Sequence, residues 1–105
     1  MRATIWHNPR CSKSRAALAL LEEAGADVTV IDYLATPPTA ADLARLIARA
    51  GLPPHALLRP GAPPLEEDDV LEAIAADPTL LERPLVETAC GVVLARPPER
   101  VRDIL

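Results

Sequence analysis

The stretch HNPRCSKSR, from His7 to Arg15, joins a short apolar segment to a run of residues with helical spacing. Residues 3–6 (ATIW) before it are typical of a buried strand, which ends at the turn pair Asn8–Pro9. After it, Ala and Leu recur at helical spacing until Gly25, a residue type that commonly ends a helix. Residues 27–33 (DVTVIDY) are rich in β-branched side chains and predict a second strand.

These elements make one strand–helix–strand unit, and the crossover of such a unit is right-handed in nearly all proteins. We therefore expect the two strands to be parallel neighbours in a sheet. The helix begins at about Ser12, which places Cys11 at its N-terminus.

The middle of the chain predicts short helices separated by turns. Thr39 and Asp42 form the pattern of a capping box, and a helix follows them. Residues 55–59 (HALLR) predict one helical turn, and residues 69–76 predict a further short helix. Residues 60–64 (PGAPP) predict an irregular surface loop, because proline lacks an amide donor and biases its neighbour away from helix.

The last part of the chain predicts a hairpin and a final helix. Residues 85–88 and 92–95 have the composition of strands, with Gly91 near the turn between them. Proline is tolerated in the first turn of a helix, so the pair at residues 97–98 can open a helix. The apolar side of this helix is formed by Val101, Ile104 and Leu105.

Composition limits the class of protein. A chain of 105 residues is long enough to form a single domain, residues 1–105, without disulfide bonds. It has 11 Lys and Arg residues against 15 Asp and Glu residues, a net charge of −4, which disfavours nucleic acid as the main ligand. No apolar run resembles a signal peptide or a membrane span. We therefore expect a cytoplasmic protein whose two cysteines are reduced.

The surroundings of Cys11 predict a reactive thiolate. Free amides at a helix N-terminus carry partial positive charge, which stabilises a negative sulfur. The side chains of Arg10, Lys13 and Arg15 add full charges, and His7 can donate a hydrogen bond or carry a proton. The same groups form a cradle for a small oxyanion. The alternative is that Cys11 is a small buried apolar residue with solvated basic neighbours.

The motif CSKS at residues 11–14 contains no second cysteine and so excludes a C-x-x-C dithiol mechanism. An oxidised Cys11 must then be reduced by a thiol from outside the chain or by Cys90. Cys90 lies next to Gly91 at the predicted hairpin tip, where the alternative is that it is an incidental turn residue.

Four blocks, in the same order along nearly the whole chain, resemble the glutaredoxin-coupled bacterial arsenate reductase family, and its small members most closely. The blocks are HNPRCSKSR at residues 7–15, ALLR at 56–59, ERPLV at 82–86 and ARPPERV at 95–101. The resemblance implies an α/β, thioredoxin-like fold, with a four-stranded mixed sheet in the order 2-1-3-4 whose last two strands are antiparallel. It also implies flanking helices, a short helical insert between the second and third strands, and a cis peptide bond before Pro84.

The resemblance implies a role for individual residues. Cys11 would be the nucleophile that attacks arsenate, and His7 and Ser14 would support its thiolate. A triad of arginines would bind the oxyanion and the arsenic intermediate: Arg59, Arg83 and Arg96. Guanidinium groups suit this task because their planar forks hold tetrahedral oxyanions through paired hydrogen bonds and stay charged. Taken singly, each arginine has the alternative of being a surface charge.

The reaction cycle that the resemblance implies begins when the Cys11 thiolate displaces oxide from arsenate or a similar small oxyanion. Glutathione, a co-substrate, then attacks the adduct, arsenic is reduced from the pentavalent to the trivalent state, and glutaredoxin removes the glutathione left on Cys11. The cycle needs no metal and no bound cofactor. We expect a monomer, because no apolar stripe is left over after the core is assigned. We expect no nucleic-acid or membrane partner.

Two other functions are compatible with a thioredoxin-like fold. One is a regulatory protein of the Spx type, which contacts RNA polymerase, but the C-x-x-C switch common in that group is removed here by Ser14. The other is a general glutathione-dependent oxidoreductase acting on a thiol or another oxyanion. The arginine triad favours the arsenate reductase over the regulator.

Overall fold

Four strands form one mixed sheet in the computed structural model, which describes residues 1–105. The strands are β1 (Arg2–His7), β2 (Asp27–Asp32), β3 (Leu85–Thr88) and β4 (Gly91–Leu94). Their order is β2-β1-β3-β4, with β1 parallel to β2 and antiparallel to β3, and β3 antiparallel to β4. The predicted sheet order, the parallel pair and the antiparallel hairpin are therefore confirmed.

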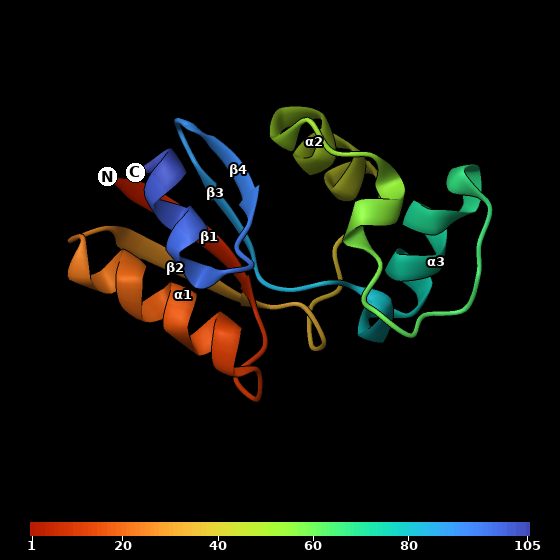
Figure 1. Cartoon of the computed structure of the whole chain (residues 1–105), viewed down its shortest axis with the longest axis horizontal. Helices are drawn as coiled ribbons and strands as arrows, with labels where there is room; N and C mark the ends of the chain where they lie inside the picture. The colour runs from red at the N-terminus through yellow and green to blue at the C-terminus, as the bar shows by residue number, and fades with distance from the viewer.

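One face of the sheet is covered by the first and the last helix (Figure 1). Helix α1 (Ser12–Glu23) and the 3₁₀ helix η4 (Pro98–Ile104) lie side by side there. Helix α1 presents Ala17 and Leu21 to strand side chains such as Ile5, all three fully buried. Small alanine side chains let the helix approach the sheet closely, and Gly25, with φ at 78°, turns the chain into β2.

The predicted insert lies on the other side of the sheet (Figure 1). It consists of α2 (Ala40–Ala50), η1 (Pro54–Leu57), η2 (Glu67–Asp69), α3 (Val70–Ala76) and η3 (Pro78–Leu80). The capping box is confirmed, because the Thr39 side chain accepts from the Asp42 amide and the Asp42 carboxylate accepts from the Thr39 amide. Leu43 and Leu46 of α2 are fully buried in the larger of the two apolar clusters.

The last helix differs from the prediction in its type and in one residue. It is a 3₁₀ helix, in which residues three apart lie above one another. Its buried residues are spaced in that way: Pro98, Val101 and Ile104. Leu105 comes one position after this row and is 37% exposed, so its assignment to the apolar side was wrong.

The edge of the sheet where β1 ends is also the edge where β3 begins, because Trp6 pairs with Leu85 in the antiparallel register. The loop that carries Cys11 therefore lies near the segment that carries Arg83 and Pro84. The Arg83–Pro84 peptide bond is cis, as predicted, and the Arg96–Pro97 bond, for which no prediction was made, is cis too.

Backbone hydrogen bonds fix the insert to the same edge. The Arg59 amide donates to the Leu80 carbonyl at 2.9 Å, and the Glu82 amide donates to the Leu57 carbonyl at 2.6 Å. Arg59 is therefore held beside the chain that leads into Arg83. No helix is both long and apolar enough to cross a membrane.

Replacing Thr39 with alanine tests the capping box. The substitution removes the acceptor for the Asp42 amide, so the free energy of unfolding should fall by about 1 kcal/mol in urea denaturation. Thr36→Ala is the matched control, because Thr36 is exposed and its side chain forms no hydrogen bond. An equal loss in both variants would show that the cap contributes nothing.

Candidate functional site

Cys11 is the N-cap residue of α1, with extended backbone angles (φ −92°, ψ 120°). Its amide donates to the Asn8 carbonyl at 2.9 Å, which closes the turn after β1, and its carbonyl accepts from the Arg15 amide at 3.0 Å. The first amides of a helix have no acceptor within the helix and point out of its N-terminus. The partly buried sulfur of Cys11 lies beside them.

The pKa of the Cys11 thiol is below its ordinary value. Burial raises the pKa, but the backbone amides of Ser14 and Lys13 and the Arg83 guanidinium together lower it by more. The amides carry the partial positive charge of the helix N-terminus, and Arg83 adds a full charge. The sulfur therefore has more thiolate character at neutral pH than an ordinary cysteine.

The helix amides act on the sulfur as predicted, but the predicted charged side chains do not. The charged side chains of Arg10, Lys13 and Arg15 are not among the groups that lower the pKa of Cys11. All three residues are exposed to water, which screens their charge, and Arg15 donates to the Pro9 carbonyl at 2.8 Å. The cation that acts on the sulfur is Arg83, which is distant in sequence.

His7 and Ser14 form a buried pair behind the cysteine loop. His7 Nδ1 lies 2.6 Å from Ser14 Oγ, which also accepts from the Asn8 amide at 3.0 Å. Burial lowers the pKa of His7, more than Asp32 raises it, so the imidazole is neutral at neutral pH. Of the two roles predicted for His7, hydrogen bonding or carrying a proton, the lowered pKa favours hydrogen bonding. The pair fixes the loop that places the Ser14 amide at the sulfur.

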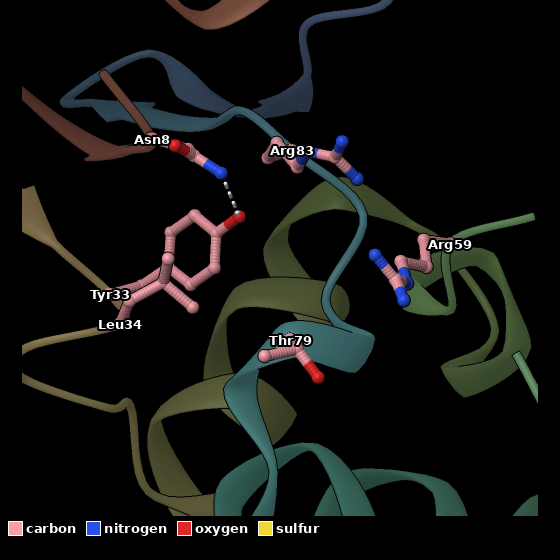
Figure 2. Close-up of a pocket in the computed structure, with 6 residues that line it drawn as sticks. All are labelled: Asn8, Tyr33, Leu34, Arg59, Thr79 and Arg83. Atoms are coloured by element: carbon pink, nitrogen blue, oxygen red, sulfur yellow. Dashed lines mark hydrogen bonds between the residues drawn. The ribbon is translucent and has the colours of Figure 1, made fainter. Parts of the chain in front are cut away.

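Arg59 and Arg83 line one pocket of about 130 Å³ at the end of the sheet. Figure 2 shows them on two neighbouring segments, with Tyr33 and Asn8 across the pocket. The Nε of Arg83 is buried and has no hydrogen-bond partner in the protein. An unpaired buried donor is costly, so an acceptor brought by a ligand would be favoured there.

Arg96 lies behind Arg83 and does not line the pocket. Its Nη1 donates to the Arg83 carbonyl at 3.0 Å, and its Nε is 3.7 Å from Glu82 Oε2. The structure thus brings Arg59 and Arg83 together at the pocket and gives Arg96 a contact with the backbone of Arg83.

Glu82 is a charged residue of the site that the sequence analysis did not single out. Its side chain is 10% exposed, and its carboxylate lies 3.7 Å from Arg83 and 3.7 Å from Arg96. A nearly buried carboxylate needs such cations. The signal was present in the block ERPLV, where an acid directly precedes the arginine.

Three pocket residues with polar side-chain groups were also missed: Asn8, Tyr33 and Thr79. Asn8 was interpreted only as a turn residue and Tyr33 only as the end of a strand. They meet because β1 and β2 are parallel, so the loops after both strands lie at the same edge of the sheet. Thr79 comes from η3 in the insert.

The second cysteine lies far from the first. Cys90 is exposed in the turn between β3 and β4, and its amide donates to Thr88 Oγ1. Thr88 pairs with Ala3 at the start of β1, whereas Cys11 follows the end of β1. Disulfides need Cα atoms within about 7 Å, so Cys90 cannot bond to Cys11 in this fold.

The geometry of the site suits a small anion. The pocket is below the roughly 300–1,000 Å³ of sites for drug-sized ligands, and it offers two guanidinium groups next to a stabilised thiolate. Guanidinium forks hold tetrahedral oxyanions well. No cluster of three or more His, Cys, Asp or Glu side chains is arranged to bind a metal ion.

Comparison with known proteins gives consistent matches over the whole chain. A family model described as the ArsC family matches residues 6–104. The arsenate reductase of Rhizobium meliloti strain 1021 is 41% identical, covering 100% of this chain and 82% of that protein. The arsenate reductase of Escherichia coli strain K12 is 40% identical, covering 97% and 79%. A solved structure of the arsenate reductase from Vibrio cholerae has a TM-score of 0.90 and 40% identity, covering 100% and 98%.

Substituting the two neighbouring arginines separates their effects on the thiol. In a Cys90→Ser background, the pH dependence of Cys11 alkylation should give a pKa that rises in Arg83→Gln, because the cation beside the sulfur is lost. Arg96→Gln should leave this pKa unchanged, because Arg96 contacts the backbone of Arg83 and not the sulfur. Equal pKa values in the wild type and Arg83→Gln would show that Arg83 does not stabilise the thiolate.

Proposed function

The chain belongs to the ArsC family, and from that membership and its site we propose that it is an arsenate reductase that uses glutathione and glutaredoxin. The observation that carries the proposal is the position of the Cys11 sulfur. It lies at the N-terminus of α1, within the influence of Arg83, which lines the pocket together with Arg59. Nucleophile and anion-binding groups are thus held together before any ligand arrives.

In the first step the Cys11 thiolate attacks the arsenic atom. A sulfur–arsenic bond forms, one arsenic–oxygen bond breaks, and the leaving oxygen takes protons from solvent and departs as water. Arg59 and Arg83 hold the remaining oxygens and balance their negative charge. The helix amides at Ser14 and Lys13 keep the sulfur ionised for the attack.

In the second step glutathione supplies the other sulfur. Its thiolate attacks the Cys11 sulfur, so that a sulfur–sulfur bond forms as the sulfur–arsenic bond breaks. The electron pair of the broken bond stays on arsenic, which is thereby reduced from As(V) to As(III) and leaves as arsenite. A glutaredoxin thiolate then attacks the glutathione sulfur and releases Cys11 as a thiolate. An external thiol is supported by the structure of the chain, because Ser14 replaces a nearby second cysteine and Cys90 lies at the other end of the sheet.

Replacing Cys11 with serine tests the nucleophile. Arsenite production with glutathione and glutaredoxin should fall to the background rate in Cys11→Ser, because a hydroxyl is not ionised at neutral pH. Cys90→Ser is the matched control and should retain activity, because Cys90 is exposed and remote from the pocket. Undiminished turnover by Cys11→Ser would end the proposal.

Omitting one component at a time separates the proposed activity from that of a general glutathione-dependent oxidoreductase. Arsenite production should require both glutathione and glutaredoxin. Turnover of a glutathione mixed disulfide without any arsenate reduction would instead assign the chain to the general oxidoreductase class.

Removing a pocket arginine should weaken the use of arsenate. Hydrogen bonds to charged groups contribute about 1.5–3 kcal/mol, so Arg59→Ala should lower kcat/KM for arsenate by roughly ten- to a hundredfold. Arg102→Ala is the control, because Arg102 is exposed on η4 and does not line the pocket. Equal kcat/KM values for the two variants would contradict the assignment of Arg59 to the anion site.

A further inference from the structure

Tyr33 forms one wall of the anion pocket. It follows β2 directly, its side chain is buried in the larger apolar cluster with 2% exposure, and its hydroxyl points toward Asn8, which lies on the same side of the pocket (Figure 2). The ring is thus fixed by packing, and only its polar end can meet a ligand. A tyrosine so buried normally has a partner for its hydroxyl.

The hydroxyl of Tyr33 accepts a hydrogen bond but donates none. Asn8 Nδ2 donates to the phenolic oxygen at 3.3 Å. The Arg10 amide donates to Asn8 Oδ1 at 3.0 Å, which leaves the NH₂ end of that side chain facing Tyr33. The phenolic oxygen therefore already accepts one hydrogen bond, while the phenolic proton is free to be donated to another acceptor.

The other hydroxyl of the pocket, that of Thr79, already donates its proton within the protein. Thr79 Oγ1 donates to Asp77 Oδ1 at 2.5 Å. The remaining lining groups are the apolar Leu34 and the cations Arg59 and Arg83, which accept nothing. No group of the pocket accepts from the Tyr33 hydroxyl in the structure, whereas an anion would bring an acceptor.

The surroundings keep this hydroxyl protonated. Burial raises the pKa of Tyr33, and the neighbouring Cys11 raises it further, although Asn8, Arg83 and Arg59 act in the opposite direction. Because the charges of Cys11, Arg83 and Arg59 all act on this pKa, the hydroxyl lies within electrostatic range of the sulfur and of both pocket arginines. A neutral donor is thus present where the oxygens of a bound anion would lie.

We propose that Tyr33 is a substrate-binding residue whose O–H donates a hydrogen bond to an oxygen of the oxyanion held by Arg59 and Arg83. Asn8 is a positioning residue, because its amide group directs the phenolic proton into the pocket. The identity of the anion as arsenate rests on the proposed function, whereas the requirement for an oxyanion rests on the pocket itself.

Protection of Cys11 from alkylation measures anion binding without turnover. In a Cys90→Ser background and without reductant, arsenate or phosphate should slow the alkylation of Cys11, and the concentration dependence gives a dissociation constant. Tyr33→Phe should raise this constant roughly tenfold or more, because one hydrogen bond to a charged group is lost. Without anion, the alkylation rate should stay at the wild-type value, since a neutral hydroxyl is removed.

A matched control separates this effect from a loss of structure. Thr29→Val removes an exposed hydroxyl on β2, away from the pocket, and should leave the dissociation constant unchanged. The thermal unfolding midpoint of each variant is measured alongside. An unchanged dissociation constant in Tyr33→Phe would overturn the proposal, and so would the absence of protection by every oxyanion in the wild type.

A double-mutant cycle tests the role of Asn8. Asn8→Ala should weaken oxyanion binding in the Tyr33 background and have a smaller effect in the Tyr33→Phe background, because it acts partly through the phenol. Additive effects would show that Asn8 does not position Tyr33. If the wild type binds arsenate but forms no arsenite, the proposed reductase function fails, while these binding measurements still decide the role of Tyr33.

Discussion

The antiparallel pairing of β1 with β3 is the constraint on which the site depends. Trp6 pairs with Leu85, so β1 ends at the edge of the sheet where β3 begins. This register brings the cysteine loop and Arg83 together, although they are far apart in sequence. A slip by one residue would turn every side chain of β3 to the opposite face of the sheet and would move Arg83 away from the sulfur. The buried side chains Ile5 and Val86 specify the register, because exposing them would be costly.

The charges at this edge are divided between two layers. Arg59 and Arg83 line the pocket, whereas Arg96 and Glu82 lie behind Arg83. The Glu82 carboxylate is 3.7 Å from both of the arginines that it faces, which limits their mutual repulsion. This distance exceeds that of a hydrogen bond, so Arg83 keeps donors for other partners. Glu82 thus stabilises both cations, while Arg83 keeps hydrogen-bond donors for a ligand.

The sequence predicted the elements that depend on local signals. The start of α1, the capping box at Thr39 and the position of Gly25 all follow from residues near one another in the chain. The strand order and the cis bond before Pro84 came from the family resemblance, since no local pattern determines either. The helix amides at Cys11 were predicted correctly, but the cations were not, because Arg10 and Lys13 are adjacent in sequence yet extend into water. Tyr33 was missed because only the tertiary fold shows that its hydroxyl has no acceptor.

The pocket lies between two parts of the chain that pack on different apolar clusters. The cysteine loop and α1 rest on the cluster that contains Ile5 and Ala17, whereas Arg59 belongs to the insert, which rests on the cluster that contains Leu57 and Leu81. Two backbone hydrogen bonds, which form the bridge between Leu58 and Leu81, tie Arg59 to the segment that enters β3. The two pocket arginines are therefore fixed relative to each other through the backbone. It follows that the packing of the insert controls how an anion is held, while the packing of α1 controls how reactive the sulfur is.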